Sequence, residues 1–172
     1  MRLEDALASL AAMPEALQRR FVDLTDTQLR FKPAVDTFSV LENVCHLRDI
    51  EVEGYARRLA LLLQADNPLL PDLDGSALAR ERRYNSQALQ PALDAFVSSR
   101  RASLAILAGV TSGQLERRGF FENVGQVSLG RLLELWVEHD QGHLKELDDL
   151  LPILREPQAG HRPKPSQSLQ SP

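Results

Sequence analysis

The amino-acid sequence predicts an all-α protein built as a bundle of four long helices. Apolar residues recur at intervals of three and four along four separate stretches, which is the periodicity of an amphipathic helix. Two of these stretches follow a serine that is well placed to cap a helix, and no segment shows a competing strand pattern. Helices of this kind bury their apolar stripes by packing against one another, which favours a bundle.

The composition indicates a single globular domain. The chain has 172 residues, of which 43% are hydrophobic and 26% charged, and its net charge is −4. This balance argues against a nucleic-acid-binding protein, which usually carries a basic face. No stretch approaches the roughly 20 apolar residues of a membrane span, and Glu4 and Asp5 stand where a secretory signal has its apolar run. With one cysteine and therefore no internal disulfide framework, we expect a cytoplasmic protein that does not associate with membranes.

The first amphipathic stretch runs from Leu3 to about Val22. Pro14 lies within it, and proline is poor inside a helix but good in its first turn. The sequence therefore predicts a break or kink near Met13. Residues Thr25–Thr37 read as a connection to the next helix.

The second helix begins with a capping box, in which Ser39 and Glu42 satisfy each other's backbone N–H groups. From Val40 it is expected to continue to about Ala65, where the following Pro68 stops it. A short helix is expected within residues 76–84, and a third long helix within 90–108. Residues 111–127 are expected to be mostly connection.

Ser128 is the expected N-cap of the last long helix, which should end near Pro152. We therefore expect residues 1–154 to form the bundle. Residues 155–172 are rich in proline, serine and glutamine, which predicts a disordered tail. His161 lies in that tail and is not a candidate for any site.

The last helix carries His139 and His143, which are four residues apart. Side chains at this spacing lie one above the other on a helix, so both imidazoles can point at one metal ion. Both fall on the apolar stripe with Trp136 and Leu147, where unpartnered polar rings are costly. These residues alone leave two interpretations open, which are a metal site and a pair of hydrogen-bonded core histidines.

His46, about two turns into the second helix, is the candidate third ligand. Three protein ligands with open positions are typical of catalytic metals, and imidazole suits zinc, nickel or iron better than magnesium. On a helical wheel, however, His46 lies away from the apolar face, beside Glu42, Asp49 and Glu53. It is therefore either a solvated histidine on a charged face or a ligand at the rim of the bundle, next to an open cleft.

If the site lies in a cleft, the carboxylates Glu42, Asp49 and Glu53 are the candidate catalytic groups, because each can orient an imidazole or carry a proton. A zincin-type peptidase is disfavoured. Asp140 stands where the H-E-x-x-H motif has its glutamate, and the shorter side chain does not reach the same water.

The start of the second helix and the histidine pair of the last helix resemble the two signatures of the DinB-like (YfiT-like) metalloenzymes. His139 and His143 occupy the place of that family's second signature, and the resemblance covers roughly Leu3–Leu151. Phenylalanine stands in place of the usual tryptophan in the first signature, W-S-x-x-E-x-x-x-H-L-x-x-x-E. The matching positions of the first signature are Phe38, Ser39, Glu42, His46, Leu47 and Glu51.

The resemblance implies an up-down-down-up four-helix bundle, often a homodimer. It also implies a divalent transition metal, such as zinc, nickel or iron, held by His46, His139 and His143. Characterised relatives include enzymes that use low-molecular-weight thiols, such as bacillithiol or mycothiol, with the metal activating the thiol.

Two classes of function follow as hypotheses. One is a metal-dependent enzyme with a small-molecule substrate, acting as a thiol-dependent S-transferase or as a hydrolase. The other is a non-enzymatic dimeric bundle or interaction module, in which the metal site is structural or vestigial. The metal content of the protein, compared with that of a His143→Ala variant, distinguishes the two classes.

Overall fold

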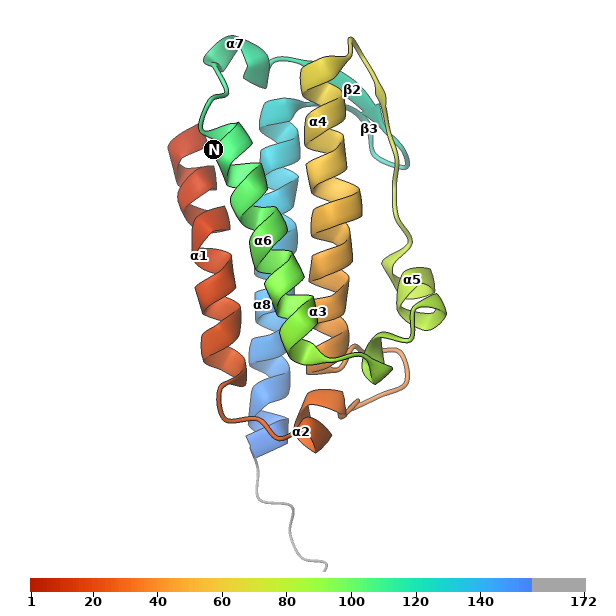
Figure 1. Cartoon of the computed structure of the whole chain (residues 1–172). Helices are drawn as coiled ribbons and strands as arrows, with labels where there is room; N and C mark the ends of the chain where they lie inside the picture. The colour runs from red at the N-terminus through yellow and green to blue at the C-terminus, as the bar shows by residue number, and fades with distance from the viewer. Residues whose placement is uncertain (156–172) are drawn as a thin grey trace, which may run out of the picture.

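The computed structural model describes residues 1–155 and shows a bundle of four long helical rods (Figure 1). The rods are α1 (Leu3–Phe21), the continuous α3–α4 rod, α6 (Leu89–Leu107) and α8 (Leu129–Arg155). Helices α1 and α8 run in one direction, and α3–α4 and α6 run in the opposite direction, which is the expected up-down-down-up order (Figure 1). The predicted four-helix bundle is confirmed, and the structure is mainly helical.

The second rod contains an unexpected π-helical segment. It consists of α3 (Val40–Asp49), the π-helix η1 (Ile50–Tyr55) and α4 (Ala56–Gln64). The predicted capping box of Ser39 and Glu42 opens it. Because a π-turn holds more residues than an α-turn, side chains beyond it are rotated relative to a regular wheel. Within the π-helical segment, Val52 is 45% exposed, whereas the carboxylate residue Glu51 is buried.

Shorter elements connect the rods. Helix α2 (Asp26–Arg30) follows α1, and Thr25 caps it. Helix α5 (Gly75–Glu81) and the 3₁₀ turn η2 (Tyr84–Ser86) precede α6. Helix α7 (Ser112–Leu115) follows α6, and the side chain of Ser128 caps α8 as predicted by accepting a hydrogen bond from the backbone N–H of Arg131.

The expectation that the chain has no strands was wrong. Strands β1 (Leu69–Leu70), β2 (Arg118–Phe121) and β3 (Gly125–Ser128) form a small sheet in the order β1-β2-β3. The β1–β2 pair is parallel and the β2–β3 pair antiparallel. The sheet lies at one end of the bundle (Figure 1), where buried Phe121 alternates with exposed Phe120. Strands this short contain too few residues for alternation to stand out in a sequence.

Of the break or kink expected near Met13, the break was wrong, because α1 continues through Pro14. Proline has no N–H to donate to the carbonyl four residues earlier, which here belongs to Leu10. That carbonyl instead accepts a hydrogen bond of 2.9 Å from the guanidinium of Arg100 in α6. A side chain from a neighbouring rod thus replaces the missing hydrogen bond of α1.

The last helix ends later than predicted, since α8 includes Pro152 and continues to Arg155. Apart from Arg155, the expected disordered tail lies outside the described residues. Within residues 1–155, no helix is both long enough and apolar enough to span a membrane. The core between the rods includes apolar side chains from all four of them, among which are Leu10, Leu17, Val44, Leu59, Phe96, Leu132, Trp136 and Leu147.

Candidate metal centre

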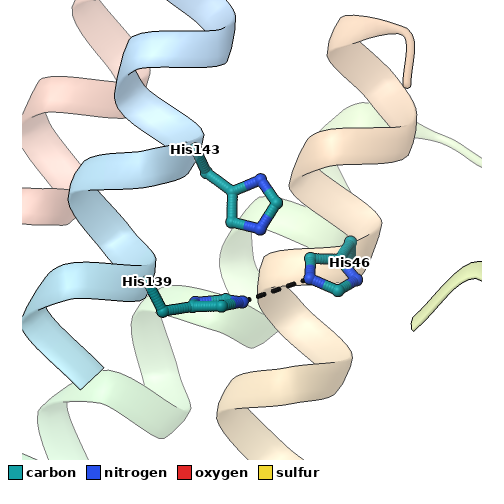
Figure 2. A group of neighbouring side chains, drawn as sticks. All are labelled: His46, His139 and His143. Carbon is teal, nitrogen blue, oxygen red and sulfur yellow. Dashed lines mark hydrogen bonds between the residues drawn. The ribbon is translucent and has the colours of Figure 1, made fainter. Parts of the chain in front are cut away.

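Three imidazoles from two rods converge on one point. His46 comes from α3, and His139 and His143 come from adjacent turns of α8 (Figure 2). One ring nitrogen from each histidine lies within 4.8 Å of the other two. The Nε2 atoms of His46 and His139 are 3.2 Å apart, as the dashed line in Figure 2 marks. The structure therefore brings together the three histidines that the sequence singled out.

The geometry and the charge state of the rings fit a divalent transition metal. Two nitrogens that are each about 2.0–2.1 Å from an ion, at angles of about 90–109°, lie about 2.9–3.4 Å apart, and the observed 3.2 Å falls in this range. Burial, reinforced by the other two imidazoles, lowers the pKa of His46 to about 3. Burial also lowers the pKa of His139. His46 and His139 are therefore neutral at pH 7 and have lone pairs to donate to a metal.

His143 is oriented by two hydrogen-bond partners. Its Nδ1 atom lies 2.8 Å from Oδ1 of Asn43 and 3.0 Å from a carboxylate oxygen of Glu146. The amide nitrogen of Asn43 donates to the backbone carbonyl of Ser39, so the amide oxygen is the atom that faces the ring. Both partners accept, which places the proton of His143 on Nδ1 and leaves Nε2 free for a metal. Neither Asn43 nor Glu146 was identified from the sequence, although Glu146 lies at the i+3 position from His143.

His46 is not the solvated histidine that one of the two interpretations proposed, because it is only 9% exposed. The wheel assumed that only the apolar face of α3 is covered. In the structure α3 packs against α2, α5, η2, α6 and α8, so its charged face is covered as well. His46 also lines a pocket, which agrees with the other interpretation, that of a ligand at the rim of the bundle next to an open cleft.

The pocket adjoins the histidines and has a volume of about 670 Å³. His46 and His143 form part of its wall, while His139 lies outside the lining. The pocket is thus large enough for a small molecule, and two of the three histidines face it directly. Its remaining lining comes from the segment before α3, from the start of α5 and from the last turns of α8, and includes Phe38, Leu73, Asp74, Gly75, Glu146 and Leu150.

The three candidate carboxylates take part in other contacts. Glu42 accepts hydrogen bonds from the backbone of Ser39 and from Lys32. Asp49 and Glu53 both bind the guanidinium of Arg82, and Asp49 also accepts a hydrogen bond from the Tyr84 hydroxyl. Within residues 1–155, no hydrogen bond joins any of the three to a histidine ring. Two other carboxylates lie beside candidate ligands: Glu146 is 3.0 Å from Nδ1 of His143, and Asp140 is 3.9 Å from Nδ1 of His139.

A buried charged cluster, also absent from the sequence analysis, lies next to His139. Arg100, which is 1% exposed, forms two hydrogen bonds with Asp140 and binds Glu51 through a 3.0 Å hydrogen bond. Glu51 also accepts hydrogen bonds from Ser103 and Trp136. Asp140 follows His139 in the chain, so this cluster connects α1, η1 and α6 to the turn of α8 that carries a candidate ligand.

Aromatic stacking extends this support to the ring of His139. The rings of Tyr55 and Trp136 are stacked with their centroids 4.7 Å apart. The rings of Tyr55 and His139 meet edge to face, with their centroids 5.6 Å apart. The Tyr55 hydroxyl donates a hydrogen bond to the backbone carbonyl of Leu135. The π-helical segment contains both Glu51 and Tyr55. It therefore supplies a buried carboxylate and an aromatic ring beside the candidate metal centre.

Gly75 permits the close approach of α5 to His46. A Cβ atom at this position would lie 2.3 Å from Cε1 and 2.6 Å from Nδ1 of the His46 ring, which is closer than atoms can pack. We expect Gly75→Ala to displace the ring and to weaken zinc binding by about tenfold or more, in line with the cost of disturbing a ligand's support. Competition with a chromophoric zinc chelator measures the change.

Gly113→Ala is the matched control, because Gly113 also lies in the first turn of a short helix and no atom lies within 4 Å of its added Cβ. This variant should bind zinc like the unmodified protein. Equal affinity of the Gly75→Ala and Gly113→Ala variants would show that the contact between α5 and His46 does not position the ligand.

The fold and the site together define a class of protein: four-helix bundles in which one histidine of the second rod and two of the last rod can hold a metal. A sequence model of the DinB superfamily matches residues 9–147, which is most of the chain. The protein therefore belongs to the DinB superfamily, and the resemblance seen in the sequence motifs is confirmed.

Two relatives extend this assignment. A protein of Oceanobacillus iheyensis, named a "putative metal-dependent hydrolase", is 22% identical over 138 residues, covering 80% of this chain and 79% of that protein. YfiT from Bacillus subtilis, described as a "probable metal-dependent hydrolase with an unusual four-helix bundle topology", matches with a TM-score of 0.82 and 20% identity. The match covers 89% of this chain and 87% of that chain. At this identity the structural likeness shows a shared fold.

Proposed function

We propose that the protein is a metal-dependent hydrolase of a small-molecule substrate, with His46, His139 and His143 holding the metal. The observation that carries this proposal is the position of the three rings beside a pocket of about 670 Å³. Three protein ligands leave coordination positions open, which is typical of catalytic rather than structural sites. The names of both relatives support the same class of reaction.

The residues of the chain have distinct roles in this proposal. A divalent cation held by the three rings would supply Lewis acidity, which lowers the pKa of a nucleophile and polarises the group it attacks. Asn43 and Glu146 keep the proton of His143 on Nδ1, so that Nε2 faces the centre. Part of the pocket wall is apolar and would exclude water from a bound substrate; it is formed by Phe38, Leu73 and Leu150.

A thiol-dependent S-transferase is the second candidate, and the sequence motifs support it. It would use a metal held by the same three histidines. A bound metal depresses the pKa of a thiol as it does that of water, so it would activate either nucleophile. The two reactions differ in the nucleophile. Hydrolysis needs no added thiol, whereas S-transfer consumes bacillithiol or mycothiol together with an electrophile.

The test is a turnover assay of protein loaded with zinc, nickel or iron, using a panel of carboxylic esters, amides and phosphoesters, with and without added thiol. We expect hydrolysis that is independent of thiol and falls by at least about 100-fold in a His143→Ala variant, because each ligand is needed to hold the metal. Turnover only with thiol would favour the S-transferase. Equal, near-zero metal content in both proteins would favour the non-enzymatic bundle.

A further inference from the structure

The charged residues that line the pocket are all acidic. Four carboxylates contribute to its wall, and none of the described residues that line it is lysine or arginine. Asp36 comes from the segment before α3, Asp74 precedes α5, and Glu146 and Asp149 come from α8. Because these side chains come from three separate parts of the chain, they place negative charge on several sides of the pocket.

Most of this charge is not balanced by neighbouring cations. Asp149 forms an ion pair with Lys145 at 2.6 Å. Within residues 1–155, Asp74 accepts only the backbone N–H of Ala77, as the cap of α5, and Glu146 contacts the ring of His143. Asp36 forms no ion pair with another residue of the described part of the chain. Three of the four carboxylates therefore face the pocket without a lysine or arginine partner.

Independent features indicate that this pocket binds a ligand. His46 forms part of its wall, is 9% exposed and has a buried Nδ1 atom without a hydrogen-bond partner. The wall also contains the apolar side chains of Phe38, Leu73 and Leu150. The pocket thus combines a reactive end at the histidines, an apolar wall and a set of unneutralised carboxylates.

We propose that the substrate carries a cationic group, such as an ammonium, joined by a short apolar chain to the group that reacts at the metal centre; this inference rests on the proposed function. The carboxylates attract a cation and repel an anion, and because all four side chains are exposed to solvent both effects are strongest at low ionic strength. The apolar wall suits the chain between the two ends of such a substrate.

The test uses three hydroxamic acids that share a metal-binding end and differ in the charge of the other end. Aminocaproic hydroxamic acid is cationic, caproic hydroxamic acid is neutral and adipic monohydroxamic acid is anionic. Calorimetric titration into the zinc-loaded protein at low ionic strength should show the cationic ligand binding about tenfold more tightly than the anionic one, with the neutral ligand between them.

The double variant Asp36→Asn/Asp74→Asn removes two of the charges without altering a residue that contacts a histidine. Asparagine caps a helix as well as aspartate does, so α5 keeps its N-terminus. The tenfold preference should fall to about threefold or less in this variant. The control Glu4→Gln/Glu116→Gln removes equal charge, in the first turn of α1 and at the C-cap of α7. Both positions are outside the pocket lining, so this variant should keep the full preference.

The outcomes separate this inference from the function on which it rests. Equal binding of the three ligands, tighter binding of the anion, or an unchanged preference in the Asp36→Asn/Asp74→Asn variant would overturn the proposal of a cationic substrate and leave the metal centre intact. If none of the ligands binds the zinc-loaded protein, the proposed function itself fails. It also fails if each ligand binds the zinc-free protein as tightly as the zinc-loaded protein.

Discussion

Replacing His139 by alanine is expected to weaken zinc binding by at least about 100-fold, because loss of a direct ligand should cost at least as much as loss of a residue that only supports one. His139 is the most informative of the three histidines, since it lies outside the lining of the pocket. Its removal therefore tests metal binding separately from substrate contacts. Competition with a chromophoric chelator measures the affinity, and the metal content of the purified protein gives an independent value.

A His161→Ala variant serves as the control, because residue 161 lies outside the described residues and the sequence assigns it no role in the site. It should bind zinc with unchanged affinity. If the His139→Ala variant binds zinc as tightly as this control, the convergence of the three rings does not reflect a shared metal site.

Arg100→Met is expected to destabilise the protein by about 3–5 kcal/mol, the usual cost of removing one partner from a buried ion pair. The guanidinium neutralises Glu51 and Asp140 and donates to the Leu10 carbonyl that Pro14 leaves free. The substitution leaves both carboxylates buried without their cation and the carbonyl without its donor. Urea denaturation of the metal-free protein, followed by circular dichroism, measures the loss.

The matched control is Arg131→Met, which removes an arginine that bridges two carboxylates, Glu134 and Glu138, on the surface of α8. Exposed ion pairs contribute little, so the change should stay below about 1 kcal/mol. A comparable, small effect of both substitutions would mean that the Arg100 cluster does not contribute to holding the rods together.

Much of the bundle was predictable because helices leave local signals in a sequence. The Ser39 capping box and the Ser128 cap marked two helix starts, and both are present in the structure. Of the break or kink expected near Met13, the break was wrong for a reason that no local pattern contains. The compensating hydrogen bond comes from Arg100, which is 90 residues away in the chain.

The candidate site likewise has features that local sequence patterns predict and features that depend on contacts between distant residues. The i, i+4 spacing of His139 and His143 is local and therefore readable. His46 was a candidate third ligand from the sequence, but the helical wheel left a solvated histidine as the alternative until the family resemblance favoured a ligand. The hydrogen bond of Asn43 to His143 and the pairing of Asp140 with Arg100 could not be predicted, because both depend on which rods face each other. The helical wheel also gave no sign that Glu51 is buried, since it assumed regular turns through a segment that is π-helical.

The central claim is that one divalent ion is bound by His46, His139 and His143. A crystal structure of the zinc-loaded protein, with anomalous diffraction data collected at the zinc edge, tests it most directly. We predict an anomalous peak between the three rings, with the Nε2 atom of each about 2.0–2.1 Å from the ion. A zinc-loaded crystal without a peak at this position, or with a peak bound by fewer than three of these rings, would contradict the claim.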